Sequence, residues 1–425
     1  MYKFHLKTFP NGLRILMVPS KESLSFQVMV LVNTGADFET KEINGISHFL
    51  EHMCFKGTKK RKTNLDIAKE LDSIGGAYNA FTGRENTGYY VRVAKEHKEL
   101  TIDIVSDIYL NSQFSESEMQ KEKGVIIEEM NMYHDDPQRY IWDLWDKLLY
   151  GDQPAGWSII GFKENIQKMK RNDFLEYYRN QYRSRSTLVV VSGNFSQNVV
   201  TRLVKNYFRD IAKGSTNSKK RIKESQKTPQ VFLEHRPTDQ TNLILGVRGI
   251  NLFDKRRYAL EVLDSVLDGG MSARLWQLVK EKLGAAYDIH SNIEHKTDVG
   301  YWAVSAGIDS NRLEIIIKAI MNELEKFRIE LIGKEEIKKA KDCIAGHLAL
   351  GLENVHNVAS RYGYQLLLKK KIETPQEYLK SIKKVTAYDL RKVAQDLLIP
   401  QHLNLILISP YKNKEKLVKL LKNNF

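Results

Sequence analysis

The sequence predicts an α+β protein of two similar domains, each a mostly antiparallel or mixed sheet with helices packed on one face. Three observations support this class. Segments rich in β-branched and aromatic residues are separated by long helical segments, without a strict alternation of strand and helix. The pattern that ends the first half of the chain returns at the end of the second half. Finally, 425 residues are too many for one ordinary core.

The chain begins with a predicted pair of strands, residues 1–18, joined by a turn at Asn11-Gly12. This segment lacks the apolar core of a cleavable signal, and no stretch of the chain reaches the apolar length of a membrane span. The two cysteines, Cys54 and Cys343, are too few for a disulfide framework. We therefore expect a cytoplasmic protein with no export signal and no membrane span.

The next predicted helix carries the most informative motif of the chain. Its apolar residues recur at helical spacing and form one face: Ile46, Phe49, Leu50 and Met53. His48, Glu51 and His52 lie on another face. Two imidazoles four residues apart can bind one zinc ion, and the carboxylate before the second can deprotonate the metal's water. This order, H-x-x-E-H, is the inverzincin signature, and a core helix with two incidental histidines would not explain it.

A catalytic zinc usually has three protein ligands, so a third should lie elsewhere in the chain. The best candidate is the acidic helical stretch 115–133, in which Glu122 and Glu129 are seven residues apart and share a face. Two glutamates that face the interior are costly unless a cation neutralises them, and a zinc ion would do so. A solvated acidic face paired with lysines is the alternative. We expect Cys54 to be a packing residue, because a fourth protein ligand would close the position of the water.

Four segments now make a family resemblance specific. They read GISHFLEHMCFKGT (45–58), GGAYNAFTGRENTGYY (75–90), EKGVIIEEMNMYHDDP (122–137) and MSARLWQLVKEKLGAAYD (271–288). Together with the H-x-x-E-H motif, they resemble the pitrilysin/insulinase family of zinc peptidases over nearly the whole chain. The chain looks closest to the short, two-domain branch that includes the mitochondrial processing peptidase subunits and bacterial relatives.

The resemblance implies a role for each residue of the metal site. His48, His52 and Glu129 match the family's zinc ligands, with one zinc ion per chain. Glu51 matches the general base, and Glu122 matches a carboxylate that lies behind the ligands. The implied activity is that of a zinc metalloendopeptidase acting on peptides or unfolded polypeptides.

The resemblance also implies how substrate is held. Segment 75–93 reads as a loop and two strands, and Asn79 and Ala80 match family positions that face the substrate backbone. Tyr287 matches a tyrosine that contacts substrate carbonyls and the developing oxyanion. The family arginine seven residues earlier is replaced by Lys280, which keeps the charge but loses the planar fork. Arg274 is a nearby alternative, for which we expect a structural role.

In the family, the tyrosine and the cation come from the half of a clamshell opposite the zinc. A chain of this length supplies one half, so the resemblance implies a homodimer in which each site uses Tyr287 of the other copy. A heterodimer with a zinc-free homologue is the alternative, and so is a structural subunit without proteolysis.

Residues 212–228 are polar and rich in Ser and Lys, and we interpret them as a linker. The linker separates an N-terminal zinc-binding domain, 1–211, from a C-terminal domain of similar fold, 229–425, without a metal site. Both halves end with a helical segment followed by an apolar strand: 172–182 with 183–195, and 387–398 with 400–411.

The net charge of +14 does not indicate a nucleic-acid binder, because the lysines are spread along the chain among acidic residues. The glycine pair in 267–275 lacks the other residues of a phosphate-binding loop. We expect peptide substrates and no nucleic-acid partner.

Overall fold

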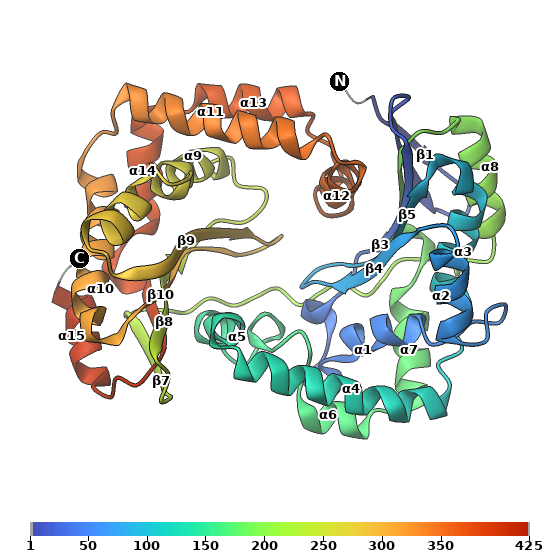
Figure 1. Cartoon of the computed structure of the whole chain (residues 1–425), viewed down its shortest axis with the longest axis horizontal. Coiled ribbons are helices and arrows are strands. Elements are labelled where there is room, and N and C mark those ends of the chain that lie inside the picture. The colour runs from blue at the N-terminus through green and yellow to red at the C-terminus, as the bar shows by residue number, and fades with distance from the viewer. Residues whose placement is uncertain (1–2, 424–425) are drawn as a thin grey trace. The chain divides into compact units, whose positions relative to one another are not determined.

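The computed structural model describes residues 3–423, apart from the side chains of Tyr287 and Asn423. The chain divides into two compact units (Figure 1). The first unit comprises Met1–Met132, Trp157–Lys220 and Leu350–Ile372, and the second comprises Tyr133–Gly156, Arg221–Ala349 and Glu373–Phe425. The segment Tyr133–Gly156 from the first half of the chain therefore belongs to the second unit, and Leu350–Ile372 from the second half belongs to the first. The prediction of two contiguous domains did not include this exchange. The stretch 212–228 contains no helix or strand, and the domain boundaries placed on either side of it stay a prediction.

The sheet of the first unit has the strand order β1-β2-β6-β3-β5-β4. All neighbouring strands are antiparallel except β2 and β6, which are parallel. The strands are β1 (His5–Thr8), β2 (Arg14–Pro19), β3 (Ser25–Val32), β4 (Ala77–Thr82), β5 (Thr87–Ala94) and β6 (Thr187–Gly193). The helices are α1 (Ile46–Cys54), α2 (Asn64–Asp72), α3 (Lys98–Leu110), α4 (Glu116–Asp135), α6 (Lys163–Lys168), α7 (Arg171–Gln181), α8 (Gln197–Tyr207) and α12 (Val355–Tyr364).

The sheet of the second unit has the strand order β7-β11-β8-β10-β9. Among the described residues, β7 and β11 are the only neighbouring strands of this sheet that are parallel, and the other neighbours are antiparallel. The strands are β7 (Gln230–His235), β8 (Gln240–Arg248), β9 (Ala286–His295), β10 (Gly300–Asp309) and β11 (Leu403–Ser409). The helices are α5 (Pro137–Tyr150), α9 (Arg257–Asp268), α10 (Leu313–Ile329), α11 (Lys334–Gly351), α13 (Pro375–Lys384), α14 (Ala387–Leu397) and α15 (Lys414–Asn423).

The two sheets confirm the predicted α+β class and its internal similarity. The strands expected near the end of each half are β6 and β11, and each lies between one parallel and one antiparallel neighbour. The alternation of side chains along these strands gives each sheet two apolar faces, because successive residues point to opposite sides. Both faces must then be covered.

The exchanged helices cover the second face of each sheet. In the first unit, α12 packs on residues such as Leu31 and Val190, while α3 and α8 lie on the other side of the sheet (Figure 1). In the second unit, α5 packs against Ile244 and Ile406, and the alternate residues of the same strands face α9, α10 and α14. Helices therefore cover both faces, whereas the sequence indicated one. The additional cover comes from the other half of the chain. Among the described residues, no helix is both long and apolar enough to cross a membrane.

Candidate metal centre

The helix that carries the histidine motif, α1, starts at a buried carboxylate. Glu39 accepts hydrogen bonds from the backbone N–H groups of Gly45 and Ser47, both at 2.8 Å, and from the side-chain amide of Asn44 at 2.9 Å. Gly45 has φ +99°, and a Cβ there would lie 2.8 Å from the Cα of Gly161. The first turn of α1 is thereby fixed. Burial raises the pKa of Glu39 to about 7, against the lowering effect of these hydrogen bonds.

Three side chains from α1 and α4 converge as a metal site requires. His48, His52 and Glu129 each offer one ligand atom, and these atoms lie within 4.8 Å of one another. Nε2 of His48 is 3.7 Å from Oε2 of Glu129, and Nε2 of His52 is 3.6 Å from the same oxygen. Two ligands of a tetrahedral zinc ion with bonds near 2.1 Å would be about 3.4 Å apart. The donor set and its spacing therefore fit one zinc ion.

Glu51 lies beside the three ligands and is held from the edge strand β4. The hydroxyl of Thr82 donates a hydrogen bond to Oε2 of Glu51 at 2.6 Å. Burial raises the pKa of Glu51, and the Thr82 bond and the neighbouring His52 act in the opposite direction. A carboxylate whose pKa is raised toward neutral pH is suited to accept a proton and to return it.

Glu122 lies behind the ligands, with both carboxylate oxygens engaged. Oε1 is 2.8 Å from Nδ1 of His52, and Oε2 is 2.6 Å from Nζ of Lys56. Burial alone would raise the pKa of Glu122, but the bonds to His52 and Lys56 outweigh it and lower the pKa. Such a carboxylate orients a ligand histidine through the ring nitrogen that does not face the metal.

The two histidines differ in their surroundings. Burial, and then the neighbouring His52, lowers the pKa of His48 to about 3, so its imidazole is neutral and able to bind a metal. Burial also acts to lower the pKa of His52, but the bond to Glu122 and the charges of Glu51 and Glu129 raise it above its usual value. Nδ1 of His48 is buried and has no hydrogen-bond partner among the described residues. Among the described residues, therefore, only His52 of the two histidines has a carboxylate that orients its ring through Nδ1.

The predicted substrate positions Asn79 and Ala80 lie in β4, the last strand of its sheet. They pair with Tyr90 and Tyr89 of β5, respectively. The other edge of β4 has no strand beside it among the described residues. Ala80 and Thr82 share one face of this strand, because residues two apart point to the same side. An extended peptide that added to β4 would therefore lie next to the strand that holds Glu51.

The remaining predicted contacts belong to the second unit. Arg274 pairs with Glu336 at 2.6 Å and with Glu323 at 3.0 Å, which favours its structural role over a substrate contact. Nζ of Lys280 lies 3.9 Å from the centre of the Trp276 ring. Tyr287 is in β9, and its side chain lies outside the described residues. The roles predicted for Lys280 and Tyr287 stay predictions.

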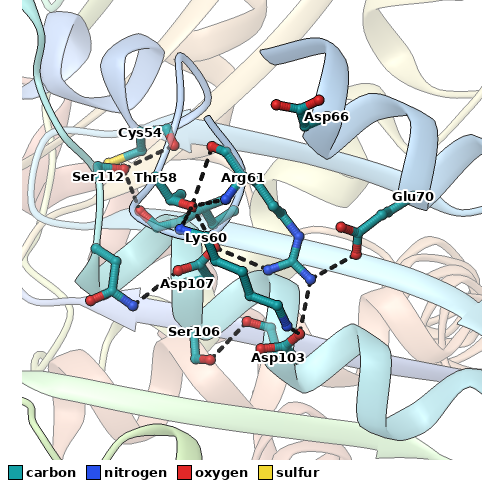
Figure 2. Close-up of polar contacts among 12 residues, drawn as sticks. Cys54, Thr58, Lys60, Arg61, Asp66, Glu70, Asp103, Ser106, Asp107 and Ser112 are labelled. Carbon is teal, nitrogen blue, oxygen red and sulfur yellow. Dashed lines mark hydrogen bonds and ion pairs between the residues drawn. The ribbon is translucent and has the colours of Figure 1, made fainter. Parts of the chain in front are cut away.

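The buried side chain of Arg61 holds the loop after α1 in place through ion pairs, which Figure 2 shows. Arg61 has a side chain only 1% exposed, and its guanidinium pairs with three carboxylates: Glu70 at 2.7 Å, Asp103 at 2.9 Å and Asp107 at 3.0 Å. The hydroxyl of Thr58 also bonds to Asp107, at 2.5 Å. The loop that begins where α1 ends is thereby attached to α2 and α3.

Four residues around the centre are absent from the sequence-based prediction: Glu39, Lys56, Arg61 and Thr82. Lys56 lies within the segment that carries the family resemblance, and Thr82 lies within the next one. No spacing rule connects Thr82 with Glu51 or Glu39 with α1, because these pairs are joined by tertiary packing. A resemblance that marks whole segments does not say which of their residues touch the site.

Two family models match parts of this chain. Residues 14–162 match the family model described as insulinase (peptidase family M16), and residues 168–343 match the model described as peptidase M16 inactive domain. The second description agrees with a second half that lacks the histidine motif.

Curated relatives span nearly the whole chain. A Bacillus subtilis protein named as the uncharacterized zinc protease YmxG is 34% identical over 96% of this chain and 98% of its own length. A Streptomyces coelicolor protein, also named as an uncharacterized zinc protease, is 34% identical over 96% of this chain and 90% of its own length.

Solved structures share the fold. The crystal structure of a protease from Helicobacter pylori matches with a TM-score of 0.91 and 24% identity, over 96% of this chain and all of that one. A structure from Pseudomonas fluorescens described as a peptidase M16 inactive domain matches with a TM-score of 0.89 and 15% identity, over 96% of this chain and 98% of that one.

Proposed function

This chain belongs to the insulinase family of peptidases, family M16, and we propose that it is a zinc-dependent endopeptidase with Glu51 as its general base. One observation carries the proposal: His48 and His52 of α1 and Glu129 of α4 offer ligand atoms within 4.8 Å of one another, next to Glu51 of α1. Three protein ligands leave a fourth position for water, which is the arrangement of a catalytic rather than a structural zinc site.

The chemistry then divides between the metal and the chain. A bound zinc ion lowers the pKa of a coordinated water and polarises a carbonyl oxygen. Glu51 accepts a proton from the water that attacks the scissile carbonyl and later returns it to the leaving amine. Thr82 keeps the carboxylate of Glu51 in one orientation during both transfers. Glu122 holds the ring of His52 through Nδ1, which leaves Nε2 for the metal.

We propose that substrate binds at the edge of β4 that has no neighbouring strand among the described residues. A peptide that adds to this edge as a strand gains affinity from backbone hydrogen bonds, with little demand on its sequence. Such binding requires an extended chain, so we propose peptides and unfolded polypeptides as the substrate class. Asn79 and Ala80 would face the substrate backbone at this edge.

The oxyanion contact is proposed to come from a second copy of the chain. Tyr287 belongs to the second domain, which the family resemblance assigns to the opposite half of a clamshell. In a homodimer each site would receive Tyr287 from the other copy, and its hydroxyl would donate a hydrogen bond to the oxygen that becomes negative. Lys280 would contribute positive charge near the same oxygen.

A mixture of unstructured peptides, analysed by mass spectrometry, tests the proposal. We expect internal cleavages that stop when a chelator removes the metal and resume when zinc is added back. Equal cleavage with and without chelator would contradict a metal-dependent reaction, and loss of terminal residues alone would contradict an endopeptidase.

A further inference from the structure

We propose that Lys56 is a positioning residue for the metal centre: through Glu122, it holds the ring of His52 so that Nε2 faces the metal. The inference rests on the proposed zinc site and concerns a residue outside the ligands and the base. Successive contacts connect Lys56 with the metal centre. Nζ of Lys56 lies 2.6 Å from Oε2 of Glu122, and Oε1 of Glu122 lies 2.8 Å from Nδ1 of His52. Nε2 of His52 in turn faces Glu129, 3.6 Å from its Oε2.

Glu122 depends on both of its partners. Its side chain is 4% exposed, and a carboxylate buried to that degree is costly unless each oxygen is bonded and its charge is compensated. Lys56 supplies the charge and one bond, and His52 supplies the other bond. Without Lys56, the free oxygen of Glu122 would turn toward water or toward another donor. The oxygen that holds His52 would then turn with it.

Such a movement of Glu122 would change the ring orientation of His52 more than that of His48. Nδ1 of His48 has no hydrogen-bond partner among the described residues, so no hydrogen bond at that nitrogen orients its ring. The ring of His52 is less buried than that of His48, and its side chain is 21% exposed against 13%. The bond to Glu122 is therefore the contact that fixes its second torsion angle and selects the nitrogen offered to the metal.

The backbone presents Lys56 rigidly enough for this role. The N–H of Lys56 bonds to the carbonyl of Met53, in the last turn of α1, at 3.2 Å. Two residues later, Thr58 is tied to Asp107 and Arg61 in the cluster of Figure 2. Because both ends of the short segment are fixed, the lysine can position Glu122 rather than follow it.

Lys60 provides a matched control. It lies on the same loop and also pairs with a carboxylate, Asp103, but its side chain is 59% exposed. Among the described residues, Asp103 pairs with Lys60 and Arg61 and with no ligand of the proposed site. Lys60→Met and Lys56→Met therefore remove the same charge and the same kind of ion pair. They differ in whether that pair reaches His52.

The test is the zinc affinity of the full chain, measured by competition with a chelator of known affinity. We expect Lys56→Met to weaken zinc binding on the order of tenfold, as other removals of outer contacts to metal ligands do. Lys60→Met should stay within about twofold of the parent. Lys56→Arg, which keeps charge and donors, should recover most of the loss, and Lys56→Gln gives a second measure of losing the charge.

A double-mutant cycle separates positioning from general damage to the fold. In a Glu122→Gln background, Lys56→Met should change zinc affinity by less than about twofold, because the residue through which Lys56 acts is already altered. An equal loss in both backgrounds would overturn the proposal, as would parent-like affinity in Lys56→Met. Failure of the parent chain to bind zinc or to cleave peptides would instead contradict the proposed function.

Discussion

Thr82 donates a 2.6 Å hydrogen bond to Glu51, and this bond joins the edge strand β4 to the helix that carries the two histidines. Thr82 is also 3.4 Å from the carbonyl of Ser47, one turn before Glu51 on the same helix. A single hydroxyl thus connects the strand proposed to receive substrate with the group proposed to move the proton. A peptide that binds to β4 would meet a base already oriented toward the metal.

Thr82→Val should slow catalysis without releasing zinc. The substitution keeps the shape of the side chain but removes a hydrogen bond to a charged acceptor, which contributes roughly 1.5–3 kcal/mol. Because that bond lowers the pKa of Glu51, its loss should move the acidic limb of the pH profile of kcat/KM to higher pH. We expect kcat at neutral pH to fall by about tenfold or more. Thr82→Ser, which keeps the hydroxyl, should behave like the parent, and an unshifted limb in Thr82→Val would contradict the assigned contact.

The Glu51→Gln variant should still bind zinc but should no longer cleave peptides at the rate of the parent. Gln can accept the Thr82 hydrogen bond but cannot take up a proton, and general-base catalysis contributes roughly 10²–10⁴ in rate. Zinc content per chain and cleavage of a quenched peptide substrate measure the two effects separately. Glu128→Gln is the control, because Glu128 is an exposed carboxylate next to the proposed ligand Glu129. Parent-like cleavage by Glu51→Gln would rule out Glu51 as the base.

Part of the proposed metal site could be predicted from sequence, because the two histidines and Glu51 follow helical spacing within one segment. His48, Glu51 and His52 are fixed on one face by the geometry of a helix, and the family resemblance chose Glu129 over Glu122 as the third ligand. The α+β class followed from strand composition and from the repeated ending of each half. These features are local or periodic, so they are present in the order of the residues.

The exchange of helices between the units could not be predicted in the same way. An amphipathic segment such as α5 or α12 indicates that one face is buried, but not which sheet buries it. The support for the site was missed for a related reason. Glu39, Lys56 and Thr82 act through side-chain contacts with other segments, and such contacts depend on the packed fold.

Glu39 should make the stability of the metal-free protein depend on pH. Its pKa is raised from 4.5 to about 7 in the folded chain, so the folded state binds more protons than the unfolded state between these values. Stability therefore falls as the pH rises through this window, by roughly 2.5 kcal/mol between pH 5 and pH 8 from this group alone. Urea unfolding of the parent and of Glu39→Gln at both pH values isolates the effect. The parent should exceed the variant by more at pH 5 than at pH 8. The exposed Glu42→Gln should show no such difference, and a constant gap for Glu39→Gln would contradict the prediction.

Arg61→Met should strongly destabilise the first unit. It leaves Asp107 and Asp103, 5% and 13% exposed, without the cation that compensates them, and removing one member of a buried ion pair costs about 3–5 kcal/mol. Lys60→Met removes an exposed cation from the same Asp103 and should cost at most about 1 kcal/mol. The urea midpoints of the zinc-free variants compare the two directly. Equal midpoints would mean that the buried guanidinium does not hold this loop.

Mixing two inactive variants tests whether a site is completed by a second copy. In a homodimer whose sites combine Glu51 of one chain with Tyr287 of the other, a dimer of Glu51→Gln with Tyr287→Phe has both defects in one site and none in the other. Subunit exchange at equal concentrations should therefore restore about a quarter of the parent activity, since half of the dimers are mixed and half of their sites are intact. If both residues of a site came from one chain, every chain in the mixture would carry a defect and no activity would return. Light scattering on the same samples gives the mass of the particle, and a fully active monomer would exclude the shared site.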